Sequence, residues 1–333
     1  PKAHHFRLCQ GEDSISTPLI PLNGYDYTLC VRRIHLDGIL WETAAGTPGV
    51  TAIDRTTATS IHKQGGRLSG VSLSGPGFDS NVSCDLVIGA DGRESLVARE
   101  AGAIEDDIVP PGLFWYYGYF ADATLPGPPE FTQSAADTDM VGTMPTNDGL
   151  LMVIYGAHVE GFDAFRRDHR ANFLAGINGH PWIARMIAGA RLATPVYGIS
   201  GIRGYYRTAH GPGWALIGDA LHQKDPVVAR GISDALLEAE WLTLALTSGV
   251  DSDHLDAYEL TVRDRTRSNA LNARMQARPD LYMTDEQGAT LAGELTTSEG
   301  LAGFVLLEYS DTLTFDAYFA APQSLTPFSI VRE

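Results

Sequence analysis

The sequence has few cysteines and no long apolar run, and each shortage argues against a class of protein. Its three cysteines, Cys9, Cys30 and Cys84, are spaced too widely for a disulfide framework or a zinc site. No apolar run approaches the roughly 20 residues that span a bilayer, and no secretory signal peptide is visible. We therefore expect no metal, no membrane partner and a reducing, cytoplasmic setting.

Basic residues are also scarce. The chain carries 24 Lys and Arg against 41 Asp and Glu, a formal net charge of −17, and only three of the basic residues are lysines. Nucleic acids and anionic membranes attract basic surfaces, so neither is expected as a partner. With 44% apolar and 20% charged residues, the 333-residue chain has the composition of a soluble globular protein of about two domains.

The most informative segment is 213–246. An apolar strand at 214–217 runs into a Gly-Asp pair, a polar loop follows, and an amphipathic helix then opens at a glycine. A strand that ends in Gly-Asp delivers a carboxylate to the carboxyl edge of a parallel sheet, where open α/β folds bind dinucleotides. A glycine at the helix start lets a ligand approach backbone N–H groups that have no intrahelical partner. The residues that carry this pattern are Gly218, Asp219, Pro226, Gly231 and Ile232.

This segment resembles the second FAD-binding motif of the flavoprotein monooxygenases of the para-hydroxybenzoate hydroxylase type (group A flavoprotein hydroxylases). Two further fragments fit in the order of that family. Asp91 and Gly92 follow a buried-strand pattern at 85–90, and Arg33 stands at the start of a predicted helix. On its own an Asp-Gly pair is weak, because it is among the commonest hairpin turns.

The resemblance implies a role for each of these residues. Asp219 would accept a hydrogen bond from a ribityl hydroxyl of FAD, and Pro226 would line the flavin ring. The backbone amides of Gly231 and Ile232 would face the pyrimidine end of the flavin, where a helix N-terminus stabilises negative charge. Arg33, Asp91 and Gly92 would contact FAD, the last two also lying near the nicotinamide cofactor.

Two residues beside these motifs have open interpretations. His222 occupies the family's histidine position, where a structural hydrogen bond is favoured over proton transfer. Arg230 departs from the family pattern and would serve the flavin or face solvent. The helix that follows is expected to bury one stripe, which consists of Ile232, Leu236, Ala239, Thr243 and Leu246.

The family's first unit, a strand–Gly-x-Gly-x-x-Gly–helix that holds the FAD pyrophosphate, has no counterpart in the sequence. We therefore expect the N-terminal βαβ part of the fold, at least about 30 residues, to lie outside this sequence. An altered enzyme without a pyrophosphate loop is the alternative.

The expected fold is α/β, with a Rossmann-like FAD-binding domain interleaved with a β-sheet substrate domain. Strands are predicted at 50–60, 66–74 and 82–90 of the FAD-binding domain. In the substrate domain, an aromatic strand is predicted at 113–120 and helices at 162–187. The predicted division is 1–30 and 106–203 for the substrate domain, 31–105 and 204–247 for the FAD-binding domain, and 248–333 for a mostly helical C-terminal region.

The function implied by the resemblance is FAD-dependent monooxygenation of a small aromatic or hydrophobic substrate. O2 would react through a flavin hydroperoxide, with electrons from NAD(P)H or a partner flavin reductase. The catalytic side chains stay unknown, and we expect a monomer or homodimer. A related FAD-dependent reductase or halogenase, and a non-catalytic fragment or pseudo-enzyme, are the alternatives. The candidate substrate-pocket residues are Trp115, Tyr117, Tyr119 and His222.

Overall fold

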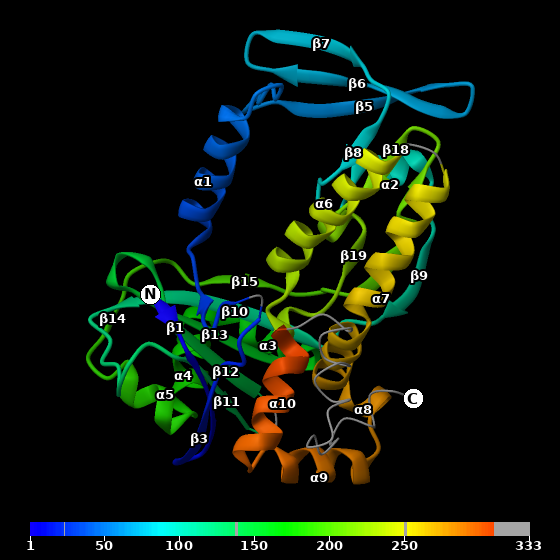
Figure 1. The fold of residues 1–333 in the computed structure, drawn as a ribbon. Helices are drawn as coiled ribbons and strands as arrows, with labels where there is room; N and C mark the ends of the chain where they lie inside the picture. Colours follow the sequence, from blue (N-terminus) through cyan, green and yellow to red (C-terminus); the bar gives the residue numbers. More distant parts are fainter. Residues whose placement is uncertain (23, 137–138, 250–251, 310–333) are drawn as a thin grey trace.

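A large, mostly antiparallel sheet forms the lower part of the molecule (Figure 1). The computed structural model describes residues 1–22, 24–136, 139–249 and 252–309. The strands of this sheet run in the order β14-β10-β13-β12-β11-β2-β3, and β15 also pairs with β10. Their bounds are β2 (His5–Gln10), β3 (Asp13–Pro18), β10 (Leu113–Ala121), β11 (Phe131–Ala135), β12 (Asp139–Pro145), β13 (Leu151–His158), β14 (Arg191–Leu192) and β15 (Tyr197–Ile199).

The N-terminal hairpin belongs to this sheet although about 100 residues separate it from its neighbour in the sheet. Strand β2 pairs in parallel with β11, with Phe6 opposite Phe131 and Cys9 opposite Ser134. The segments 1–30 and 106–203, which the sequence assigns to a substrate domain, therefore contribute strands to one sheet.

The aromatic strand β10 places its side chains on alternate faces of the sheet, as a strand must. Phe114, Tyr116 and Phe120 are buried in a core with side chains from the helical segment that follows β13. Trp115 on the opposite face packs with Leu113, Ile202 and Ala277. The helices of that segment are η2 (Val159–Gly161), α3 (Phe162–Phe165), η3 (Arg166–Asp168), α4 (His169–Asn178) and α5 (Pro181–Met186).

Three small sheets and a two-stranded pair account for the remaining strands. One sheet has the order β17-β18-β8, the second β19-β16-β9 and the third β5-β6-β7, while β1 pairs with β4. The bounds are β1 (Lys2–Ala3), β4 (Thr28–Leu29), β5 (Thr57–Gln64), β6 (Arg67–Gly75), β7 (Phe78–Ser83), β8 (Val87–Gly89), β9 (Glu105–Val109), β16 (Gly204–Arg207), β17 (His210–Gly211), β18 (Trp214–Leu216) and β19 (His222–Gln223).

The predicted strand 82–90 was wrong, because it spans two elements of different sheets. Strand β7 ends at Ser83 in the β5-β6-β7 sheet, and β8 begins at Val87 beside β18. Every residue of β7 is exposed, so this strand lacks the alternation of buried and exposed side chains that marks a half-buried strand. The first strand of this sheet was predicted to begin at residue 50, but β5 begins only at Thr57.

Helix α1 (Arg33–Gly46) stands apart from the helices α6 and α7 in Figure 1 and leads toward the β5-β6-β7 sheet. None of its residues is buried. Four large apolar side chains of the helix are exposed, namely Ile34, Ile39, Leu40 and Trp41. Tertiary packing therefore contributes little to α1 within the described part of the chain.

Helix α6 (Gly231–Ser248) packs against α7 (Ser252–Ala277). The stripe of residues predicted to be buried on α6 was wrong. Its buried residues are Asp234, Glu238 and Leu242, whereas Ile232 is 44% and Leu236 is 50% exposed. The buried face of α6 is thus turned away from the apolar stripe expected from the sequence.

The described C-terminal region is helical, as predicted for 248–333 up to residue 309, and 310–333 lie outside the described residues. After α7 follow α8 (Pro279–Tyr282), α9 (Asp285–Glu294) and α10 (Ser298–Tyr309). Leu301 and Val305 of α10 are buried in a cluster with Phe6 of β2. Among the described helices, none combines the length and apolar character that crossing a membrane requires.

The two leucines of α6 provide a test of its orientation. Leu242 is 2% exposed and belongs to the core, so Leu242→Ala should destabilise the fold by about 2 to 5 kcal/mol. Leu236→Ala removes the same atoms from a half-exposed site and should cost less than about 1 kcal/mol. Urea unfolding measures both. Equal losses from the two variants would contradict the observed face.

Candidate functional site

The two Asp motifs lie at the same edge of one sheet. Strands β8 and β18 are parallel, with Gly89 opposite Leu216, and Ile217 N–H donates to the Gly89 carbonyl at 3.0 Å. Asp91 and Asp219 each follow the carboxyl end of one of these strands. This is the edge at which open α/β sheets bind ligands.

Glycine makes both turns. Gly92 has φ +77° and Gly218 has φ +62°, values in the left-handed region that side chains disfavour. Gly218 begins the short η4 (Gly218–Ala220), so the chain turns directly after β18 and presents Asp219 at its start.

Asp91 caps a helix. Its Oδ1 accepts a hydrogen bond from the Ser95 hydroxyl at 2.5 Å, and its Oδ2 accepts from the Leu96 N–H at 2.7 Å. These groups lie at the N-terminus of α2 (Leu96–Ala101), where a carboxylate stabilises unpaired N–H groups. Both carboxylate oxygens thus have partners within the chain, an arrangement that the Asp-Gly pattern alone does not reveal.

Asp219 is differently placed, because its carboxylate is exposed. Its side-chain contact in the described structure is the Gln223 amide, which donates to Oδ2 at 3.4 Å. The Tyr205 hydroxyl donates to the Asp219 carbonyl at 2.6 Å and so fixes the backbone. Burial of Tyr205 raises the pKa of its hydroxyl to about 12, which keeps it a donor at neutral pH. Asp219 therefore combines a fixed backbone with an accessible carboxylate.

Arg33 lies within electrostatic reach of Asp219. A hydrogen bond to Asp37 is the main cause of its raised pKa; burial lowers the pKa, and the negative charges of Asp37 and, more weakly, Asp219 raise it further. The Arg33 guanidinium bonds Asp37 at 2.7 Å and is 67% exposed. The structure thus places Arg33 near Asp219, with its guanidinium accessible and held by a neighbour on its own helix.

The start of α6 is open. A Cβ added at Gly231 would meet no atom within 4 Å, and no side chain caps the helix. The first-turn N–H groups of Gly231 and Ile232 are therefore accessible to a ligand. Pro226 begins η5 (Pro226–Val228), and Ala229 then takes a left-handed φ of +51° before the helix. This turn determines where α6 begins.

A network of buried polar side chains lies next to the Gly-Asp turn. His222 Nδ1 is 2.7 Å from Glu238 Oε1, and the Gly218 N–H donates to Glu238 Oε2 at 2.5 Å. Lys224 Nζ lies 2.8 Å from His222 Nε2 and also bonds Asp234. Because an ammonium only donates, His222 accepts at Nε2 and carries its proton on Nδ1.

Arg230 completes this network. Its guanidinium is 3.0 Å from Asp234 and buried, so the interpretation that it faces solvent was wrong, and a role toward the flavin stays a prediction. Burial alone raises the pKa of Asp234, but Lys224 and Arg230 outweigh burial and lower the pKa overall. His222 is 4% exposed, and its ring is stacked on that of Tyr206 with centroids 4.9 Å apart, which agrees with the structural hydrogen bond favoured from the sequence.

The candidate aromatic residues of β10 separate into two kinds. Trp115 is 5% exposed, and its indole N–H donates to Asp225 at 3.0 Å. Tyr117 and Tyr119 are partly exposed on the same face of the sheet as Trp115, and the Tyr117 ring centroid lies 5.4 Å from that of Tyr197. Tyr117 and Tyr119 are therefore available to a ligand, whereas Trp115 is part of the core.

Arg207 joins both motif loops and was not found from the sequence. It donates to the Ala220 carbonyl of the Gly-Asp turn at 2.9 Å and to the Arg93 carbonyl after Asp91-Gly92 at 2.9 Å. It also pairs with Glu105 at 2.9 Å. A buried arginine leaves no pattern in the sequence that distinguishes it from a surface arginine, because two of its partners, Arg93 and Glu105, lie 114 and 102 positions away.

The described residues include no group of three His, Cys, Asp or Glu side chains arranged to hold a metal ion. The accessible features at this edge are a carboxylate acceptor, an uncapped helix N-terminus and an arginine. Together they suit a ligand that carries hydroxyl groups and negative charge.

The chain is similar in sequence to known reductases. No protein-family model matches the chain. Digeranylgeranylglycerophospholipid reductase of Methanosarcina acetivorans is 27% identical over 260 residues, which cover 74% of this chain and 61% of that protein. The enzyme of the same name from Methanothrix thermoacetophila is 25% identical over 237 residues, covering 66% of this chain and 56% of that protein. The chain thus spans about three fifths of the length of these relatives.

The chain also shares its fold with solved structures of flavin-dependent enzymes. A triple mutant of the flavin-dependent brominase Bmp2 superposes with a TM-score of 0.75 at 16% identity, covering 100% of this chain and 81% of that one. The FAD-dependent chondrochloren halogenase CndH from a myxobacterium gives a TM-score of 0.73 at 20% identity, covering 100% and 80%. The chain therefore has the mixed α/β fold of FAD-dependent flavoproteins.

Arg207 can be tested against its neighbour Arg203, which pairs with the same Glu105 but is more exposed. Arg207→Met leaves two buried carbonyls without a donor and should destabilise the fold by about 3 kcal/mol. Arg203→Met removes an outer ion pair and should cost less than about 1 kcal/mol. Urea unfolding of both variants measures the difference. If the two midpoints coincide, Arg207 does not hold the loops.

Proposed function

We propose that this chain is the FAD-binding and substrate-binding part of an FAD-dependent oxidoreductase, a monooxygenase of small aromatic or hydrophobic molecules. One observation carries the proposal. Asp219 follows the carboxyl end of β18 beside β8, and Glu238 of α6 bonds the Gly218 N–H there, so the exposed carboxylate lies beside the helix with the open N-terminus. A cofactor bound at this edge would lie between the two motifs and the aromatic face of the large sheet.

The residues present fit FAD. Asp219 would accept a hydrogen bond from a ribityl hydroxyl, since its carboxylate is exposed. The amides of Gly231 and Ile232 would stabilise negative charge at the pyrimidine end of the ring, as an uncapped helix N-terminus does. When bound, FAD supplies the transfer of electrons from NAD(P)H to O2.

The protein would contribute position and exclusion of water. Tyr117 and Tyr119 present aromatic side chains on one face of β10, so they would pack against an apolar substrate. We assign no general base, because the cofactor carries the oxidising chemistry, and the catalytic side chains stay unassigned.

A second candidate is an FAD-dependent reductase of isoprenoid lipids, favoured by the 27% identity to the Methanosarcina acetivorans enzyme. A halogenase is a third, favoured by structural likeness.

Oxygen consumption separates the candidates. In the full protein with FAD, phenols, indoles or polycyclic aromatics should stimulate NAD(P)H oxidation and O2 uptake, and yield a product that contains one oxygen from O2. Anaerobic reduction of a prenyl double bond would instead identify the reductase, and halide-dependent product the halogenase. A colourless protein that cannot be loaded with FAD would contradict all three.

Asp219 is the most direct test of the cofactor site. Asp219→Ala removes a charge-assisted hydrogen bond worth about 1.5 to 3 kcal/mol, so the FAD dissociation constant should rise roughly ten- to a hundredfold. Fold stability should change little because the carboxylate is exposed. Asp79→Ala on the exposed strand β7 is the matched control and should bind FAD like the wild type. Wild-type affinity in Asp219→Ala would refute the assigned role.

A further inference from the structure

Asp225 is a buried carboxyl that connects two distant parts of the chain. Its Oδ1 accepts the indole N–H of Trp115 at 3.0 Å, across 110 positions, and the N–H of Val227 at 3.0 Å. Trp115 belongs to β10 of the large sheet, whereas Asp225 directly precedes η5 and the start of α6. One oxygen atom therefore ties the loop before α6 to the sheet.

The large sheet is shaped to receive this indole. A Cβ added at Gly156 on the neighbouring strand β13 would lie 2.4 Å from the Trp115 ring, so a side chain there would displace it. On the other side of the bond, Asp225 is the N-cap of η5, where its side chain accepts the Val227 N–H. The Asp225 carboxyl is thus held by the local turn.

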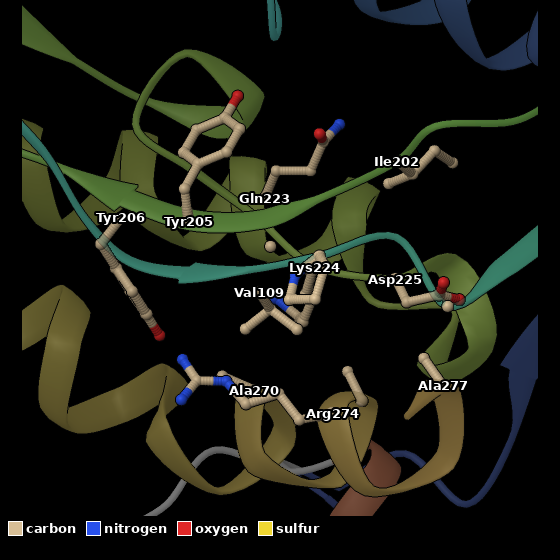
Figure 2. A pocket seen from close by; sticks show the side chains of 14 residues that line it. Val109, Ile202, Tyr205, Tyr206, Gln223, Lys224, Asp225, Ala270, Arg274 and Ala277 are labelled. Atoms are coloured by element: carbon tan, nitrogen blue, oxygen red, sulfur yellow. The ribbon is translucent and has the colours of Figure 1, made fainter. Parts of the chain in front are cut away.

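The second oxygen of Asp225 is different, because Oδ2 is buried without a hydrogen-bond partner in the described structure. Asp225 is 7% exposed and lines a small cavity enclosed by β9, β16 and α7 (Figure 2). A buried polar atom without a partner is costly, and the cost is far larger for a charged carboxylate than for a neutral acid.

Two cationic side chains line this cavity in the described structure, Lys224 and Arg274, and both are engaged with other acidic residues. Lys224 lines the same cavity but bonds His222 and Asp234. Arg274 of α7 bonds Asp107, and Figure 2 shows its guanidinium directed toward Tyr206 and away from Asp225. The other titratable groups that line the cavity are Tyr205 and Tyr206 of β16.

Burial accordingly raises the pKa of Asp225 from its usual 3.8 to about 7. The hydrogen bonds from Val227 and Trp115 to Oδ1, and the nearby backbone N–H of Leu113, lower the pKa but do not outweigh burial. The neutral acid keeps Oδ1 as an acceptor for both N–H groups. The ionised form leaves an unbalanced charge in the cavity, which is relieved when the carboxylate moves toward water and releases Trp115.

We infer that Asp225 is a positioning residue of the proposed flavin site, which holds the start of α6 against β10 as a neutral acid and releases it on ionisation. The inference rests on the proposed function only for the identity of the ligand at α6, because the bond between loop and sheet is a property of the chain itself. It adds a pH-dependent control to the site.

The direction of the pH effect follows from the two states. The folded protein keeps the Asp225 proton up to about pH 7, whereas the unfolded chain loses it near pH 3.8. The stabilisation is therefore complete below pH 3.8 and is lost as the pH rises to about 7.

Asp225→Asn tests this without flavin, because the amide retains an acceptor at Oδ1 and cannot ionise. From pH 5 to pH 8, the unfolding equilibrium constant of the wild type should rise about a hundredfold relative to that of Asp225→Asn. Urea unfolding at both pH values gives the ratio, in which other titrating groups cancel. A ratio that does not change with pH would overturn the inference.

A second measurement keeps the test valid if Asp225→Asn fails to fold. The near-ultraviolet circular dichroism of the wild type should titrate with a midpoint near pH 7, as Trp115 is released. Trp115→Phe removes the indole donor and should abolish this transition. A wild-type spectrum that stays constant from pH 5.5 to about 8.5 would contradict release of the loop.

Flavin binding then separates this inference from the proposed function. The FAD dissociation constant of the wild-type full protein should rise about tenfold from pH 6 to pH 8.5, and that of Asp225→Asn should not change. A protein that shows the pH-dependent unfolding but binds no FAD would refute the proposed function and leave the role of Asp225 in the fold standing. Equal pH dependence of FAD binding in both proteins would refute control by Asp225.

Discussion

The geometry of the candidate site depends on the hydrogen bonds of Glu238, a carboxylate that is fully buried in the middle of α6. It accepts the Gly218 N–H at 2.5 Å and the His222 imidazole at 2.7 Å, and so holds the Gly-Asp turn against the helix. Burying a carboxylate is unfavourable unless its oxygens are satisfied. The turn, the helix and the residues between them therefore form as a unit, which brings Asp219 and the open N-terminus of α6 to the same edge.

The same interaction explains why the orientation of α6 was not predictable from periodicity. A helix in a soluble protein usually buries its apolar stripe, which for this sequence would include Ile232 and Leu236. Here the polar residues Asp234 and Glu238 are buried, because Lys224, Arg230, His222 and a backbone N–H offer them partners. Hydrophobic patterning contains no information on such partners, so it gave the position of the helix and the wrong face.

Local signals were otherwise sufficient for much of the fold. The aromatic strand at 113–120, the helical segment broken at Pro181 and the Gly-Asp turn all appear close to their expected places, because each depends on residues that are near in sequence. Two roles escaped prediction for different reasons. Asp91 bonds groups four to six residues ahead, but an Asp-Gly pair fits a hairpin turn or a ligand contact as well as a helix cap. Arg207 depends on a distant partner, the carbonyl of Arg93, 114 positions away.

Two independent connections therefore hold the site together, one within the motif edge and one between the loop before α6 and the large sheet. Arg207 fixes the two motif loops to each other through backbone carbonyls, which do not change charge with pH. Asp225 fixes the loop before α6 to β10 through a carboxyl whose pKa lies near neutrality. A rise in pH thus leaves the relation between the Asp motifs intact while it loosens the start of α6 from the sheet that carries Tyr117. Since a ligand at this edge would need both surfaces at once, the weaker of the two connections sets the conditions under which the site is complete.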